Sequence, residues 1–318
     1  MSFADDIRAI DLEQLEISDY NRRYLQQLIP SLDYYLDIYR HTLQRIVSAT
    51  GRSAAETTLV DYGGGHGLMS LTAKRFGIGR VVYVDFNPLS CTTVKALAAR
   101  LGCGPDAVLC GDSRTLLSWC AEQGVTPDAL AGMDVIEHIY RLEPFFDDLF
   151  TLNPQISMVF TTGSVPSNPM VRRRLHRVMM ADEEGNAGMP GFRAERRQYL
   201  EEHFPSMEDK ELDEWALRTR GLMFADIESA VARGINAPQD RYNTCDPATG
   251  SWTERILNIG EYRRILHPHT EAVAFSNGFY NGLRPGLKGL VAKMLNGLLH
   301  LPGSQPIAPF IFIEINTQ

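Results

Sequence analysis

A glycine-rich turn between an apolar run and a helix-forming segment constrains the fold of this chain more than any other feature. The apolar run leads into the sequence Asp61-Tyr62-Gly63-Gly64-Gly65-His66-Gly67. Alternating glycines let a backbone approach a ligand where a Cβ atom would collide. A helix that follows such a turn directs its free N–H groups at that ligand. The turn therefore predicts a binding site at the end of a buried strand.

Three further apolar stretches end in polar residues and are predicted to be strands. The second strand ends at Asp85, about twenty positions beyond Gly63, where a nucleotide-type ligand places its ribose hydroxyls. The third strand ends at Asp112 and Ser113, and the fourth is expected to run from residue 129 to residue 137. Polar residues at the carboxyl ends of successive strands are typical of the ligand crevice of an open α/β sheet.

Strands and helices alternate from residue 59 to residue 162, which predicts a parallel sheet with helices on both faces. Helices are expected over 68–76, 88–101, 116–123 and 143–149, with a fifth strand over 156–162. The last two strands are expected over 270–276 and 307–315. A helix over 252–266 is predicted before them, and an apolar helix over 287–299, expected to pack on its own domain, between them.

In these motifs the chain resembles the class I S-adenosylmethionine-dependent methyltransferases, especially the ubiquinone-biosynthesis type and the type 11 and type 12 methyltransferase domains. The turn from Asp61 to Gly67 matches the family's first motif, an acid followed by alternating glycines. Asp85 matches the ribose-binding acid, and Asp112 with Ser113 the loop beside the adenine. The segment 134–139 is similar to the part of the ubiquinone-type enzymes that contains Glu-His.

The resemblance implies an α/β fold with a Rossmann-like, mostly parallel sheet of seven strands, an antiparallel last strand and S-adenosylmethionine as cofactor. It also implies two sets of site residues. The expected cofactor-binding residues are Asp61, Gly63, Gly65, Gly67, Asp85, Phe86, Asp112, Ser113 and Asp134. The expected catalytic residues are Glu137 and His138.

Several of these residues have a second interpretation. Asp61 either holds the glycine turn or contacts the cofactor's amino group indirectly, and Asp112 either binds the adenine side or caps the next helix. Histidine as a residue type titrates near neutral pH, which makes His138 a candidate general base, but the more common role of such a histidine is to order its loop or to pack under it.

Three parts of the chain are expected to have different roles. Residues 1–50 form an N-terminal helical cover rich in tyrosine, and residues 51–166 with 251–318 form the S-adenosylmethionine-binding methyltransferase domain. Residues 167–250 form a helical insertion after strand five, expected to act as a lid. Arginines gather in that insertion at 172–174 and 177, and again at 193, 196 and 197. If they turn inward, they favour a small-molecule acceptor with a carboxylate or phosphate.

Two other functions remain open beside methyl transfer to an oxygen or nitrogen of a small molecule. A dinucleotide oxidoreductase requires a small residue at the sixth position of its glycine fingerprint, where this chain has Leu68 or Ser70. A non-catalytic protein that binds S-adenosylmethionine would keep the same motifs.

Composition excludes further classes of protein. The net charge of −8 argues against a general binder of nucleic acids or anionic membranes, although it leaves room for a local basic patch. No apolar run reaches the ~20 residues of a membrane span, and the first residues lack the pattern of a signal peptide. Five scattered cysteines are typical of free thiols in a reducing compartment, so the expected location is cytoplasmic. No cluster of metal ligands stands out, and the oligomeric state and the acceptor stay open.

Overall fold

The computed structural model describes residues 2–186, 189–237 and 242–316, which form two compact units. The first unit contains Met1–Val135, Glu143–Thr162 and Arg263–Gln318. The second contains Ile136–Leu142 and Gly163–Tyr262. Each is described by itself below.

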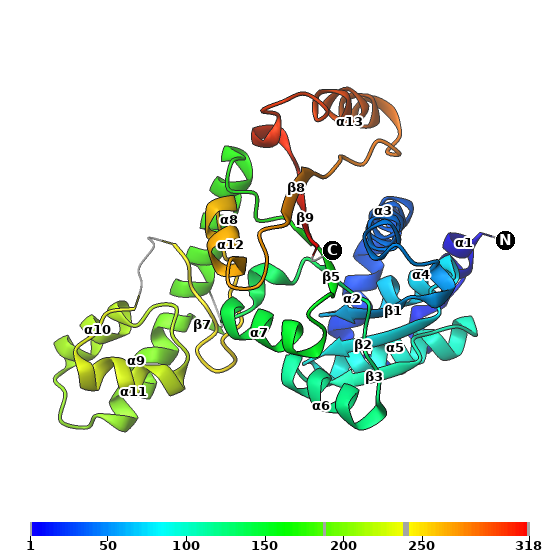
Figure 1. The fold of residues 1–318 in the computed structure, drawn as a ribbon. Coiled ribbons are helices and arrows are strands. Elements are labelled where there is room, and N and C mark those ends of the chain that lie inside the picture. The colour runs from blue at the N-terminus through cyan, green and yellow to red at the C-terminus, as the bar shows by residue number, and fades with distance from the viewer. Residues whose placement is uncertain (1, 187–188, 238–241, 317–318) are drawn as a thin grey trace. The chain divides into compact units, whose positions relative to one another are not determined.

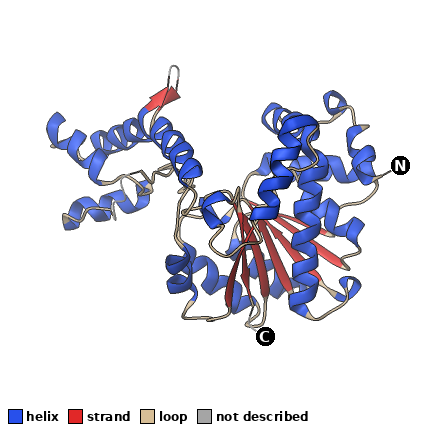
Figure 2. Ribbon diagram, turned by 90° about the horizontal axis from the view of Figure 1, so that it is seen from above, coloured by secondary structure: helices blue, strands red, loops and turns tan. Residues whose placement is uncertain are grey.

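The first unit is built on a seven-stranded sheet in the order β3-β2-β1-β4-β5-β9-β8 (Figures 1 and 2). The strands are β1 (Thr58–Tyr62), β2 (Arg80–Asp85), β3 (Ala107–Cys110), β4 (Ala129–Met133), β5 (Ser157–Thr162), β8 (Val273–Asn277) and β9 (Ile311–Ile315). The first five are parallel, and β9 pairs antiparallel with both β5 and β8. The predicted Rossmann-like fold is therefore confirmed, and the carboxyl ends of β1 to β4 meet at one edge.

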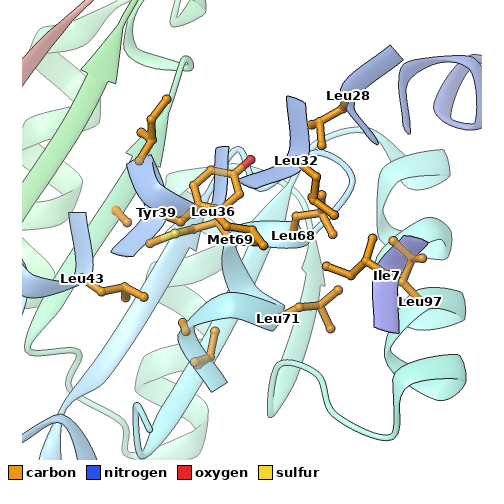
Figure 3. Close-up of a cluster of buried hydrophobic side chains, with 14 of the residues drawn as sticks. Ile7, Leu28, Leu32, Leu36, Tyr39, Leu43, Leu68, Met69, Leu71 and Leu97 are labelled. Atoms are coloured by element: carbon orange, nitrogen blue, oxygen red, sulfur yellow. The ribbon is translucent and has the colours of Figure 1, made fainter. Parts of the chain in front are cut away.

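One face of this sheet is covered by the helices that precede and follow the glycine turn. These are α1 (Phe3–Arg8), α2 (Asp19–Leu28), α3 (Leu32–Thr50), α4 (Leu68–Phe76) and α5 (Pro88–Leu101). Their apolar side chains form one buried cluster, in which Leu36 and Leu43 of α3 face Leu68 and Leu71 of α4 (Figure 3). The four leucines are completely buried, so burial of apolar area holds the N-terminal helices to the core.

The opposite face is covered by α7 (Leu142–Leu152), next to which lies α6 (Ser113–Gln123). Neighbouring strand residues point to opposite faces: Val159 belongs to the cluster described above, whereas the Phe160 ring packs edge-on against Phe146 of α7. A hydrogen bond from Ser113 to Asp148 joins the start of α6 to α7. Helices on both faces fit the prediction.

The second unit is mainly helical. It contains α8 (Pro169–Glu184), α9 (Phe192–His203), α10 (Asp209–Arg218) and α11 (Phe224–Arg233), with a short hairpin of β6 (Gly185–Asn186) and β7 (Met189–Pro190). Leu200, Leu212 and Ile227 form its small apolar core. Beside it, the fully buried Arg196 is paired with Glu183, which also accepts a hydrogen bond from Thr244.

The prediction that the fourth strand continues to residue 137 is wrong. The strand ends at Met133 because Asp134 adopts φ 48°, a left-handed conformation that breaks an extended strand. The following residues Ile136–His138 form a 3₁₀ turn.

The helix expected over 252–266 begins only at Ile259, as α12 (Ile259–Leu266). Its predicted first half is extended because backbone groups there bond to other segments. The N–H groups of Trp252 and Arg255 donate to the carbonyl oxygens of His138 and Glu137. The last strand also starts later than predicted, at Ile311, after a 3₁₀ turn over Gln305–Ile307.

The helix between the last two strands, α13 (Gly286–Leu298), does not bury its apolar face as expected. Leu287, Leu290 and Met294 are 75%, 57% and 65% exposed. Among the described residues, no helix is both long and apolar enough to cross a membrane.

Candidate cofactor site and second-unit cavity

The glycine turn adopts a conformation that only glycine tolerates well. Gly63, Gly65 and Gly67 have φ angles of 66°, 52° and 82°, which are left-handed. A Cβ atom on Gly63 would lie 2.3 Å from Val135, and one on Gly67 would lie 2.2 Å from Val94. A Cβ atom on Gly65 would meet no protein atom within 4 Å. The turn is therefore packed at both ends and open in the middle, as a ligand cradle requires.

Tyr83 supports the middle of the turn from beneath. Its hydroxyl donates to the carbonyl oxygen of Gly65 at 2.6 Å, and its ring fills the space that a side chain on Gly64 would need. This contact was not predicted from the sequence. The only signal is a tyrosine among the valines that lie between Arg80 and Asp85.

Asp85 joins the turn to the end of β2. One of its carboxylate oxygens accepts the Gly65 N–H at 2.8 Å, and the other accepts the Asn87 N–H at 2.8 Å. Burial raises the pKa of Asp85, and these two hydrogen bonds oppose that rise. Next to it, the Phe86 side chain is 65% exposed at the carboxyl edge of the sheet. Asp85 and Phe86 together present a hydrogen-bond acceptor beside an apolar surface.

Asp61 lies beneath the turn and is completely buried. Its Oδ2 atom accepts a hydrogen bond from the Ser70 hydroxyl at 2.6 Å, whereas Oδ1 has no hydrogen-bond partner among the described residues. Burial raises the pKa of this carboxyl to about 7, against the opposing effect of Ser70. Asp61 thus ties β1 to the first turn of α4.

Asp61 is expected to make the stability of the protein fall as pH rises between about 4 and about 7. Its pKa is higher in the folded than in the unfolded chain, so over that range the unfolded chain ionises while the folded chain keeps its proton. Each step up in pH therefore favours the unfolded state, until Asp61 ionises in the folded state as well at about pH 7. Urea unfolding of the wild type and of Asp61→Asn at pH 4.5 and pH 8 measures the effect. Between pH 4.5 and pH 8, the free energy of unfolding of the wild type should fall by on the order of 2–4 kcal/mol more than that of the variant, whose amide does not titrate. Equal losses would mean that Asp61 is already ionised at pH 4.5.

Asp112 and Ser113 lie at the start of α6. The Asp112 carboxylate accepts the Thr115 N–H at 3.0 Å and caps the helix, which is the second of its two predicted interpretations. The Asp112 side chain is exposed. The neighbouring Gly111 donates its N–H to the Asp85 carbonyl oxygen, which places Asp112 at the same edge of the sheet as Asp85. The capping role leaves the carboxylate accessible to a ligand.

Asp134 is surrounded by tyrosines of the N-terminal helices. It is an exposed, non-glycine residue with φ 48°, and its N–H donates to the Thr161 carbonyl oxygen at 3.1 Å. Burial, followed by the nearby Asp134 carboxylate, raises the pKa of Tyr24 to about 12 and raises that of Tyr35 as well. Strained non-glycine residues of this kind gather at functional sites.

Helix α2 lies beside the glycine turn. The rings of Tyr24 and His66 are 5.2 Å apart, and a buried hydrogen bond of 2.8 Å from Asn21 to Thr93 attaches α2 to α5. Burial lowers the pKa of His66 to about 4, so its ring is neutral at pH 7. The Nδ1 atom of His66 accepts the Leu68 N–H at 3.2 Å, which gives His66 a packing role in the turn.

Glu137 and His138 belong to the second unit. Glu137 is 2% exposed, and its carbonyl oxygen accepts the Arg255 N–H. The Nδ1 atom of His138 lies 2.8 Å from the Trp252 carbonyl oxygen. A carbonyl oxygen only accepts hydrogen bonds, so Nδ1 carries the proton and the lone pair of neutral His138 is on Nε2.

A cavity of about 690 Å³ lies along α8 in the second unit. Arg172, Arg173 and Arg177 line it, together with His176, whose ring stacks on Tyr242 at 3.6 Å. Within the described part of the chain, no carboxylate forms an ion pair with any of the three arginines. Glu184 also lines the cavity, so three guanidinium groups face one carboxylate there, and this excess of positive charge favours an anionic ligand.

Among the described residues, no group of three or more histidine, cysteine, aspartate or glutamate side chains is placed to hold a metal ion.

Comparison with known proteins returns methyltransferases. No family model and no curated protein sequence matches the chain. Among solved structures, it is similar to the plantazolicin methyltransferase BamL in complex with a triazolic desmethylPZN analog and SAH, at 15% identity over 99% of this chain and 96% of that one (TM-score 0.42). The plantazolicin methyltransferase BpumL, in complex with SAH, gives 11% identity over 99% and 94% (TM-score 0.39).

The ribosomal protein L11 methylase from Lactobacillus delbrueckii subsp. bulgaricus gives 21% identity over 43% of this chain and 67% of that one (TM-score 0.31). The sequence identities and TM-scores of these matches are too low to assign a function to this chain.

Proposed function

We propose that the protein is an S-adenosylmethionine-dependent methyltransferase that acts on an oxygen or nitrogen of an anionic small molecule. The observation that carries the proposal is the glycine turn, open in front of Gly65 and joined there to Asp85. A backbone cradle next to a carboxylate at the end of the second strand suits a nucleoside whose ribose hydroxyls donate to the acid.

The residues at this edge fit the cofactor. Gly63, Gly65 and Gly67 leave the backbone free of side chains, and Asp85 has lone pairs left after its two backbone contacts. The exposed ring of Phe86 and the start of α6 at Asp112 and Ser113 would hold the adenine. When bound, S-adenosylmethionine supplies a methyl group already activated on a sulfonium, so the protein mainly contributes positioning.

Residues of the second unit would serve the acceptor. The Nε2 atom of His138 is suited to take a proton from an O–H or N–H group, because the Trp252 carbonyl oxygen holds the proton on Nδ1. Glu137 keeps this segment in place through Arg255. We assign the acceptor itself to the arginine-lined cavity of residues 167–250, where Arg172, Arg173 and Arg177 would bind its carboxylate or phosphate.

Calorimetry with S-adenosylhomocysteine and NAD is expected to show binding of the first ligand only. Asp85→Ala should weaken that binding by about 1–3 kcal/mol, or roughly 5- to 150-fold, because the ribose hydroxyls lose their acceptor. Asp106→Ala is the matched control. Asp106 also accepts a backbone N–H, that of Val81 at 2.7 Å, but at the opposite end of β2.

Three outcomes separate the possible functions. Tight NAD binding without S-adenosylhomocysteine binding would refute the methyltransferase and favour an oxidoreductase. Equal weakening by Asp85→Ala and Asp106→Ala would remove Asp85 from the site. Binding of the cofactor with no turnover on any acceptor would favour a non-catalytic protein.

A further inference from the structure

The exposed apolar side chains of this protein are concentrated on α13 and its flanks. Seven of the large hydrophobic residues that are exposed in the described chain lie between positions 283 and 301: Leu283, Leu287, Leu290, Val291, Met294, Leu298 and Leu301. Contiguous exposed apolar surface in a globular protein marks an interaction site or an aggregation hazard. The exposed apolar surface of this segment is therefore a candidate interaction site.

The helix has one inner and one outer face. Gly289 and Ala292 are buried on the inner face, where a Cβ on Gly289 would lie 1.8 Å from the Arg284 carbonyl oxygen. Leu287, Leu290, Val291, Met294 and Leu298 follow a spacing of three and four residues, so they form one outer stripe.

The inner side of the helix is joined to the segment that follows β8. The Asn296 side chain bonds to both the N–H and the carbonyl oxygen of Tyr280, at 2.7 and 3.0 Å. Tyr34 of α3 donates to the Phe279 carbonyl oxygen at 2.7 Å. Figure 1 shows α13 beyond the ends of β8 and β9, and the two contacts above involve the loop between β8 and α13. With its inner face turned to the protein, the helix leaves the outer stripe exposed.

The charged side chains of the segment that carries the stripe are all positive. Lys288 and Lys293 are exposed, and at about 100° per residue they lie on opposite borders of the stripe. Arg284 precedes the helix, and no aspartate or glutamate occurs from residue 272 to residue 313. This is notable in a chain with a net charge of −8.

We propose that α13 docks in the surface of an anionic lipid bilayer. An apolar stripe bordered by lysines suits a helix that lies in the plane of the membrane, with the lysine stems reaching the headgroups. Each cation near an anionic surface adds to binding. A second copy of the chain is a poorer occupant, because a symmetric contact between two stripes would bring Lys288 and Lys293 against their counterparts.

Sedimentation of the full-length protein with vesicles tests the proposal. Vesicles of phosphatidylserine and phosphatidylcholine are expected to bind the protein at least about tenfold more tightly than phosphatidylcholine alone, and salt should reduce that difference. Leu290→Glu with Met294→Glu should abolish binding to both. Lys288→Gln with Lys293→Gln should abolish the preference for the anionic vesicles.

A control is Met170→Glu, which places a single glutamate at an 82% exposed methionine on α8 and should leave vesicle binding unchanged. No binding to anionic vesicles, or binding that Leu290→Glu with Met294→Glu leaves intact, would overturn the proposal. So would a dimer in analytical ultracentrifugation that the same double variant dissociates, since a second copy would then cover the stripe. S-adenosylhomocysteine affinity, measured in parallel, reports separately on the proposed function.

Discussion

A Gly67→Ala variant is expected to lose a large share of the stability of the first unit. The new Cβ atom would lie 2.2 Å from Cγ2 of Val94 and 3.3 Å from its Cα, so the backbone of α5 has to move. The left-handed φ of 82° adds about 1–2 kcal/mol for any residue with a Cβ atom. With overpacking of about 1–3 kcal/mol, the sum is a large share of the ~5–15 kcal/mol that stabilises a typical protein. Urea unfolding measures the loss.

Two other glycines separate strain from ligand binding. Gly65 and Gly51 have φ angles of 52° and 62°, and a Cβ on either meets no atom within 4 Å. Gly65→Ala and Gly51→Ala should therefore each lose only about 1–2 kcal/mol of stability. Only Gly65→Ala should lose affinity for S-adenosylhomocysteine, because its methyl group occupies the open part of the turn. If both variants bind the ligand equally, the turn is not the cofactor cradle.

Replacing Arg172, Arg173 and Arg177 together by glutamine is expected to reduce kcat/KM for an anionic acceptor by at least about 100-fold. Each guanidinium group that pairs with the acceptor contributes about 1.5–3 kcal/mol, and the loss should fall mainly on KM. Methyl transfer from radiolabelled S-adenosylmethionine to a panel of small carboxylates and phosphates measures it. The affinity for S-adenosylhomocysteine should stay the same.

Arg174→Gln is the control for this triple variant. Arg174 is an exposed arginine of the same helix that does not line the cavity. A comparable fall in kcat/KM with Arg174→Gln would show that the overall charge of α8 matters rather than the cavity. An unchanged kcat/KM in the triple variant would place the acceptor elsewhere.

The parts of the fold that the sequence predicted well depend on local signals. Glycine spacing, apolar runs and the proline at position 88 lie within a few residues of the structure that they specify. For this reason the bounds of α4 and α5 agree with the prediction residue for residue. The position of Asp85 at the end of β2 follows from the same kind of signal.

The remaining features depend on contacts between distant segments. Nothing local to Tyr83 indicates that its hydroxyl holds Gly65, and nothing local to Asp134 indicates its left-handed backbone. Arg196 and Arg197 are neighbours in one arginine-rich helix. Arg196 is fully buried against Glu183, whereas Arg197 pairs with the exposed Asp213. Only the packing of α9 in its unit distinguishes the two.

The position of β9 has a consequence for the order in which the protein can be built during translation. β9 is the last strand along the sequence, yet it lies between β5 and β8 and pairs with both. While the ribosome is still extending the chain towards Ile311, β8 has no neighbour and the edge of β5 is open. Unpaired edges of this kind invite association with other chains. The interval between synthesis of β8 and synthesis of β9, which contains all of α13, is therefore the period in which a nascent chain most needs a chaperone.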